Sequence, residues 1–226
     1  MRRVLTLILC LGFLALPAQA AGGQEYVALT FDDGPSGRFT RTLLDGLQER
    51  GVEATFLLCG YRMEQYPDIT QRMVDEGHEI GLHGYSHKSM KDMSRRDIAQ
   101  ELSDCQALLP RGYVPQFFRP PGGCCSDAVR QVAEVRGLAI LNWSVDPQDW
   151  AAHSAAAIEK AVLSHIHDGD IVVLHDMSDS SVQAALDIVD VLQEQGYTLV
   201  TVGDLARLRG VSVRGGKTYT KFPPAS

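Results

Sequence analysis

Short apolar runs alternate along the chain with longer segments of helical periodicity. The run Ile171–Leu174 is apolar without a break, as in strands that are buried on both faces of a sheet. The longer segments carry apolar residues three and four positions apart, and several of them end at a glycine. The expected strands span residues 27–31, 53–58, 79–82, 116–118, 138–141, 171–174 and 198–202. The expected helices span residues 39–50, 67–76, 94–109, 126–136, 155–167, 181–195 and 203–208.

This alternation predicts an α/β fold with a parallel sheet, either open or closed into a barrel. The chain has 226 residues, 45% of them hydrophobic, which is enough for one sizeable core. We see neither an interdomain linker nor an internal repeat, so we expect a single domain over residues 26–209. The tail, residues 210–226, is polar with Gly and Pro, and we expect it to be partly loose.

The first 20 residues have the pattern of a signal peptide. Arg2 and Arg3 precede an apolar stretch over residues 4–16, and Ala18-Gln19-Ala20 forms a cleavage pattern. The stretch is shorter than the roughly 20 residues that a spanning helix needs, so we favour cleavage over a retained membrane anchor. Residues 21–25 would then form a short segment before the domain. The sequence therefore predicts an exported protein, either extracellular, cell-wall-associated or periplasmic.

The charge balance argues against a nucleic-acid partner. The formal net charge is −7; without the two leader arginines, 19 of the 21 basic residues remain against 28 acidic ones, a net charge of −9. An acidic chain without a basic run is a poor match for a phosphate backbone.

Four cysteines remain after the expected cleavage: Cys59, Cys105, Cys124 and Cys125. The even number permits disulfides, and metal-bound thiolates are an alternative, but the spacing matches no zinc-ribbon pattern. Cys124 and Cys125 are neighbours and could pair with each other only in a strained bridge. The sequence does not decide between these states.

Two adjacent carboxylates, Asp32 and Asp33, stand where the first expected strand meets a Gly34-Pro35 turn. Neighbouring side chains on a strand point to opposite faces, so the two are expected to have different surroundings. A buried aspartate is costly unless it is paired, hydrogen-bonded or bound to a metal. The alternative is a solvated turn.

Other polar groups also follow expected strands. His83 and His87 come after the third strand, Arg119 after the fourth, Asp149 after the fifth and His175 after the sixth. Each has a structural alternative: a His-x-x-x-His loop can be purely structural, and the arginine can lie in a surface turn. However, the chemistry of parallel α/β folds gathers at the carboxyl ends of the strands, so their joint placement predicts one site.

The residue types in this set suggest a division of labour. Two imidazoles and one carboxylate make a three-ligand site with open positions, as in catalytic zinc sites. A second, adjacent carboxylate can serve as a general base, and a histidine beside an aspartate can serve as a general acid. The combination predicts metal-assisted hydrolysis of an acyl bond.

Five segments in order, TFDDGP, HGYSH, RPPGG, DPQDW and VVLHD, resemble the motifs of the polysaccharide deacetylases of the NodB-homology type, carbohydrate esterase family 4. The resemblance covers about residues 26–208. It implies a distorted (β/α) barrel, often with seven strands, and a divalent metal, usually zinc.

The resemblance also implies a role for each matching residue. Asp32 is the implied base, Asp33, His83 and His87 the metal ligands, Arg119 the residue that orients the base, His175 the acid, Asp149 its partner, Trp150 and Leu174 the lining of the acetyl-methyl pocket, and Gly122 the backbone N–H for the oxyanion. Many members of the family carry an aromatic residue, often tyrosine, where this chain has Gly122. We therefore expect a more open cleft at that point.

These implications predict an exported, metal-dependent deacetylase that hydrolyses the acetamide of N-acetylated sugars in peptidoglycan or a chitin-like glycan and releases acetate. Its expected partner is the acetylated polysaccharide, and the expected state is a monomer without a membrane span. One alternative is an O-acetyl esterase of the xylan type. Another is a catalytically silent protein that binds glycan or metal.

Overall fold

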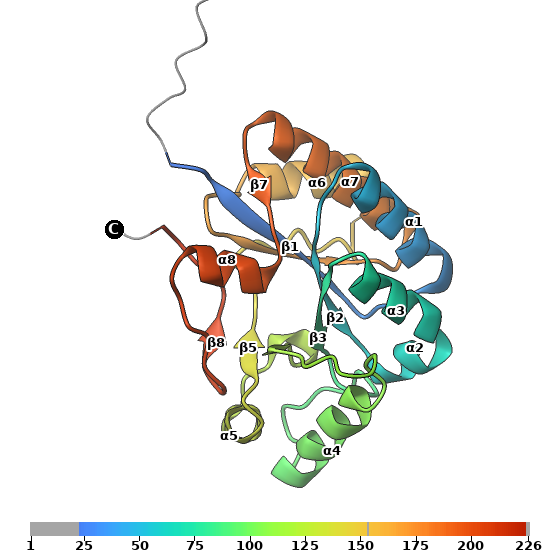
Figure 1. Cartoon of the computed structure of the whole chain (residues 1–226), viewed down its shortest axis with the longest axis vertical. Coiled ribbons are helices and arrows are strands. Elements are labelled where there is room, and N and C mark those ends of the chain that lie inside the picture. The colour runs from blue at the N-terminus through green and yellow to red at the C-terminus, as the bar shows by residue number, and fades with distance from the viewer. Residues whose placement is uncertain (1–22, 153, 225–226) are drawn as a thin grey trace, which may run out of the picture.

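The structure, a computed structural model, describes residues 23–152 and 154–224. The predicted signal peptide, residues 1–20, lies outside the described residues. Parallel strands form a curled sheet, and helices wrap its outer face (Figure 1). The strands are β1 (Tyr26–Asp32), β2 (Thr55–Leu58), β3 (Glu79–Leu82), β4 (Phe117–Phe118), β5 (Ala139–Leu141), β6 (Ile171–His175), β7 (Thr198–Leu199) and β8 (Thr218–Tyr219). The helices are α1 (Gly37–Glu49), α2 (Gly60–Gln65), α3 (Pro67–Asp75), α4 (Arg95–Gln106), α5 (Asp127–Val135), α6 (Ala155–Leu163), α7 (Asp179–Glu194) and α8 (Val202–Leu208).

The strand order confirms the predicted fold class. The sheet runs β6-β1-β2-β3-β4-β5-β8, β7 pairs with β1, and every pairing between these strands is parallel. The segment after β5 returns to the opposite edge, where Val145 bridges Val172 and its carbonyl accepts a hydrogen bond of 3.1 Å from the Val173 N–H. The sheet is thus curled almost into a closed barrel, in a single α/β domain.

The helices bury the apolar faces that their periodicity predicted. On α1, Leu43, Leu44 and Leu47 are completely buried, and α1 packs beside α7. Ser94 and Ser126, at the first positions of two expected helices, accept hydrogen bonds from backbone N–H groups in the first turns of α4 and α5. Helix α2 was not predicted, because its six residues are too few to show a period.

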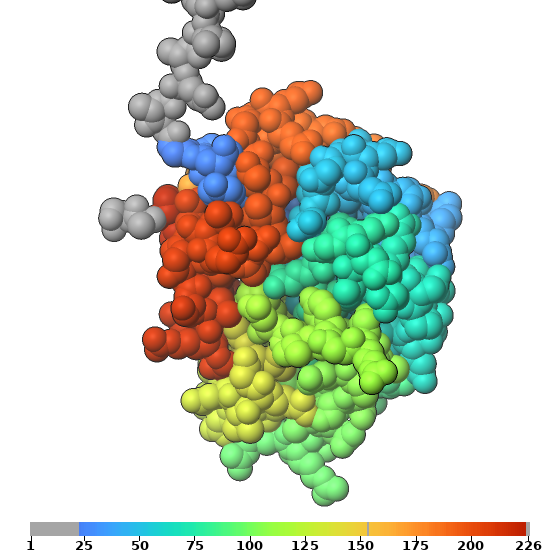
Figure 2. Space-filling model, viewed as in Figure 1, coloured from blue at the N-terminus to red at the C-terminus, as the bar shows by residue number. Residues whose placement is uncertain are grey.

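The described part of the tail is anchored to the domain, where a partly loose segment was expected. Strand β8 pairs with β5, and the Phe222 N–H donates to the Gly169 carbonyl at 2.8 Å. Tyr219 and Phe222 are buried, with their rings stacked 5.2 Å apart. In Figure 2 the C-terminal segment, in red, lies against the yellow segment that contains β5 and α5. Two aromatic anchors therefore hold a segment whose composition is otherwise polar.

The four cysteines of the described region are free thiols. Cys59 and Cys105 are buried, whereas Cys124 and Cys125 are partly exposed. Within residues 23–152 and 154–224, every helix is too short or too polar to cross a bilayer.

Candidate active site

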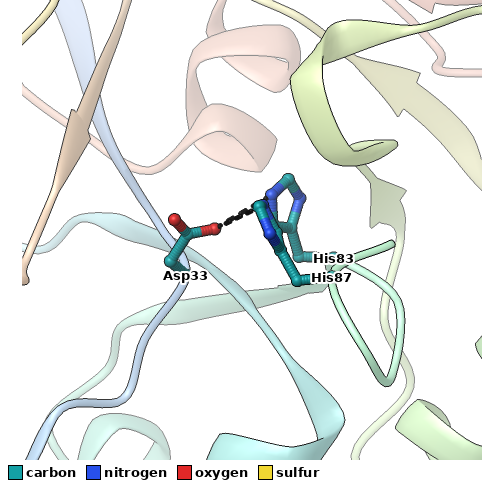
Figure 3. Close-up of side chains that lie close together, drawn as sticks. All are labelled: Asp33, His83 and His87. Atoms are coloured by element: carbon teal, nitrogen blue, oxygen red, sulfur yellow. Dashed lines mark ion pairs between the residues drawn. The ribbon is translucent and has the colours of Figure 1, made fainter. Parts of the chain in front are cut away.

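The three predicted metal ligands converge at the carboxyl ends of β1 and β3. Asp33 Oδ1 lies 3.3 Å from His83 Nε2 and 3.0 Å from His87 Nε2. In Figure 3 the carboxylate reaches from the segment after β1 toward the two imidazoles of the loop after β3. Asp33 and His87 both adopt left-handed backbone conformations, with φ of 70° and 57°. Non-glycine residues seldom take this conformation, which is enriched at functional sites.

The donor set fits a divalent metal ion. Asp33 Oδ1 is buried and has no hydrogen-bond partner among the described residues. His83 Nδ1 lies 2.7 Å from the Arg119 carbonyl oxygen, which can only accept, so Nδ1 carries the proton and Nε2 presents a lone pair to the site. Burial raises the pKa of Asp33, but the close approach of the His83 and His87 imidazoles lowers it well below its usual range. An ionised carboxylate and nitrogen lone pairs are the ligands that zinc takes.

Asp32, the expected base, is held by a buried arginine. Its carboxylate is almost inaccessible, and Arg119 Nη1 donates to Oδ1 at 2.6 Å. Arg119 is completely buried and also donates to Thr30 Oγ1 at 2.9 Å and to the carbonyls of Leu141 at 2.9 Å and Asn142 at 3.1 Å. Because these bonds fix the guanidinium, it holds the Asp32 carboxylate in one orientation.

His175, the expected acid, is paired with Asp149. The Asp149 carboxylate accepts from His175 Nδ1 at 2.7 Å and from the His175 backbone N–H at 2.8 Å. Burial lowers the pKa of His175, but the hydrogen bond and charge of Asp149 outweigh it and raise the pKa to about 9. The sheet register places His175 directly opposite Asp32 on the neighbouring strand. The Arg119–Asp32 pair and the Asp149–His175 pair therefore face one another.

One cavity of about 440 Å³ joins these groups. It is lined by Asp32, Asp33, His83, His87, Gly122, Trp143, Asp146, Trp150, Val173 and His175. Gly122 and Trp150 thus lie where expected, and the Trp150 side chain is largely exposed, at 72%. No described atom lies within 4 Å of the position that a Cβ on Gly122 would take, so the cavity is open on this side, as expected.

The assignment of Leu174 needs correction. Its side chain is completely buried in the core and does not line the cavity, whereas that of Val173 does. Successive strand residues point to opposite faces, so Val173 and His175 share the inner face and Leu174 points outward.

Trp143 and Asp146 also line the cavity, and the sequence prediction gave neither of them a role in the reaction. Trp143 is wedged between two site segments: the Arg119 guanidinium lies 5.4 Å from its ring, and a Cβ on Gly123 would come within 3.0 Å of the indole. Both residues follow β5 closely, and that position was the available signal.

Comparisons with known proteins agree with this geometry. A profile of the family described as polysaccharide deacetylase matches residues 19–141. The peptidoglycan-N-acetylmuramic acid deacetylase PdaC of Bacillus subtilis is 35% identical over 188 residues, which are 82% of this chain and 40% of PdaC. The chain therefore spans only about two fifths of that relative. A peptidoglycan-N-acetylglucosamine deacetylase of Bacillus cereus is 34% identical over 197 residues, covering 84% of this chain and 92% of the relative.

Among solved structures, a family 4 acetyl xylan esterase from Clostridium thermocellum in complex with a cobalt ion superposes with a TM-score of 0.82. It is 34% identical, and the match covers 88% of this chain and all of that one. The family match over residues 19–141 includes Asp33, His83 and Arg119 and ends before His175. The chain belongs to the polysaccharide deacetylase family.

Proposed function

We propose that this protein is an exported, metal-dependent deacetylase that hydrolyses the acetamide of N-acetylated sugars in peptidoglycan and releases acetate. The observation that carries the proposal is one cavity that combines the Asp33-His83-His87 donor set with an arginine-held carboxylate and an aspartate-held imidazole. The likeness to peptidoglycan deacetylases supports the choice of glycan.

In this proposal Asp33, His83 and His87 hold a divalent metal ion, and we favour zinc. When bound, the ion supplies Lewis acidity that polarises the acetyl carbonyl and acidifies water. Asp32, oriented by its ion pair with Arg119, accepts the proton of the attacking water. The backbone N–H of Gly122 donates to the oxygen that becomes negative.

His175 completes the reaction as the general acid. Its Nδ1–H donates to Asp149, which leaves Nε2 to deliver a proton to the departing sugar nitrogen as the C–N bond breaks. An amine is a poor leaving group without a proton, whereas an ester oxygen depends on protonation less. A histidine whose pKa is raised to about 9 stays protonated at neutral pH, which favours amide hydrolysis.

The sugar is proposed to lie against the two tryptophans of the cavity. Trp150 is exposed and Trp143 is braced by Arg119, so both offer apolar faces for a pyranose ring. Val173 takes the place first assigned to Leu174 beside the acetyl methyl. The opening at Gly122 leaves room for a polymer to continue.

The esterase remains a second candidate because the acetyl xylan esterase has the same fold with a TM-score of 0.82. To separate the two, acetate release should be measured side by side on N-acetylglucosamine oligomers, peptidoglycan and acetylated xylan, with zinc present. We expect release from the N-acetylated substrates and its loss in His175→Ala. Release from xylan alone would favour the esterase, and no release from any substrate despite bound zinc would favour a silent binding protein.

A further inference from the structure

The catalytic roles proposed above do not use Asp176, the residue that directly follows His175. Its side chain is completely buried, and no lysine or arginine of the described chain forms an ion pair with it. Burial raises the pKa of its carboxyl to about 7, and its Oδ1 has no hydrogen-bond partner among the described residues. A buried carboxyl that has no ion pair and one oxygen without a hydrogen bond lowers the stability of the fold. Its presence therefore needs a reason other than stability.

Asp176 is joined to the segment that follows the Asp32-Asp33 pair. Thr40, in the first turn of α1, donates from its hydroxyl to Asp176 Oδ2. Ser36 donates from its hydroxyl to the Asp176 carbonyl at 2.5 Å, and the Ser36 N–H donates to Thr40 Oγ1 at 2.6 Å. Ser36 and Thr40 are both buried. This small network therefore connects the end of β6 to the start of α1, away from water.

The carboxyl of Asp176 also occupies the space beside Gly34. A Cβ on Gly34 would lie 2.7 Å from Asp176 Oδ1 and 2.9 Å from Oδ2, closer than side-chain carbons approach such atoms. Gly34 is the residue immediately after the proposed metal ligand Asp33. The turn after the carboxylate pair thus rests directly on Asp176.

We propose that Asp176 is a positioning residue that holds the Gly34-Pro35 turn and so fixes Asp32 and Asp33 relative to His175. The inference rests on the roles proposed above for these three residues. Asp176 directly follows the proposed acid in the chain. It also contacts Gly34, which directly follows the proposed base and metal ligand. It sets their separation without touching the substrate.

Asp170 provides a matched control at the other end of β6. It is also a buried aspartate, and it accepts hydrogen bonds of 2.8 Å from the Ser144 hydroxyl and the His167 N–H, but it lies at the amino end of the strand, away from the cavity. Asp176→Ala and Asp170→Ala should both lower the thermal midpoint.

The test is the zinc dissociation constant, measured by calorimetry on protein shown to be folded by circular dichroism, together with kcat and KM. We expect Asp176→Ala to weaken zinc binding about 10- to 100-fold and to lower kcat with little change in KM, as when a residue that orients ligands is removed. Asp170→Ala should leave zinc binding unchanged. Equal zinc affinities in the two variants would show that Asp176 only fills space and would overturn the inference.

A double-mutant cycle tests the contact with Gly34. Gly34→Ala alone should weaken zinc binding, because its methyl group collides with the carboxyl, and the same change in the Asp176→Ala background should cost little. If the losses of zinc affinity in the two single variants simply multiply in the double variant, the contact between Gly34 and Asp176 would be contradicted. If Asp176→Ala does not fold, Thr40→Val keeps the volume and removes the donor. It should weaken zinc binding about two- to tenfold, and an unchanged affinity would overturn the inference.

These zinc measurements separate the inference from the proposed function. A wild-type protein that binds zinc but releases no acetate would refute the function alone.

Discussion

Replacing Asp149 with Asn should change the pH dependence of the reaction more than its rate at low pH. Asp149 is buried and contacts His175 twice, at 2.7 Å and 2.8 Å, and it is the main reason that the pKa of His175 rises to about 9. An amide of the same shape lacks the negative charge. Burial is then opposed only by the charges of Asp32 and Asp33, so the pKa of His175 should fall to near its ordinary value of 6.5.

The size of the effect follows from the protonated fraction of His175. At pH 8 about nine tenths of the imidazole is protonated with a pKa near 9, but only about 3% with a pKa of 6.5. Protonation alone therefore lowers the activity of Asp149→Asn roughly thirtyfold at pH 8 and less than twofold at pH 6. A bound divalent cation would lower the pKa of His175 in the wild type and in the variant alike. The difference between the two values would remain.

The assay is kcat/KM for acetate release from N-acetylglucosamine oligomers between pH 6 and pH 10, with saturating zinc. A general acid must be protonated, so activity falls as pH rises through its pKa, and the variant should lose activity at lower pH than the wild type. Asp146→Asn is the control: this exposed carboxylate lines the same cavity without an ion pair to His175 and should leave the alkaline limb in place. A variant-to-wild-type ratio that is equal at pH 6 and pH 8 would show that Asp149 does not set the pKa of the general acid.

Three further outcomes are expected. Trp143→Ala should raise KM about two- to tenfold with kcat nearly unchanged, and an unaltered KM would mean that the indole does not contact the sugar. Phe222→Ala should reduce the free energy of unfolding in urea by about 3–5 kcal/mol, because the ring is buried against Tyr219; a loss below about 1 kcal/mol would show that the tail is dispensable. Chelation should abolish acetate release without changing the circular dichroism spectrum, and added zinc should restore it; activity that survives chelation would contradict the metal requirement.

Much of the fold was predictable because its signals are local. Helix α1 shows its buried face through Leu43, Leu44 and Leu47, and β6 shows its burial through a continuous apolar run. The convergence of the site residues was predictable for a topological reason: residues that follow parallel strands meet at one edge of the sheet.

The features that the sequence did not predict correctly depend on contacts that the local pattern does not encode. In the run Ile171–Leu174 all residues are apolar, so no alternation marks Val173 as the inward side chain. The pairing of β8 with β5 involves two residues in a polar tail. The contact between Thr40 and Asp176 joins positions 136 residues apart, so it becomes visible only when the sheet brings β1 and β6 together.

The adjacent carboxylates have different proposed tasks, metal binding for Asp33 and proton transfer for Asp32. Bound zinc and acetate release, both measured in Asp33→Ala and Asp32→Asn, distinguish the two tasks. Asp33 Oδ1 faces both imidazoles at 3.0 and 3.3 Å, whereas Asp32 is bound to Arg119. Asp33→Ala should lose zinc and activity together, and Asp32→Asn should keep zinc while turnover falls at least about a hundredfold. Zinc retained by Asp33→Ala, or full turnover by Asp32→Asn, would contradict this division of roles.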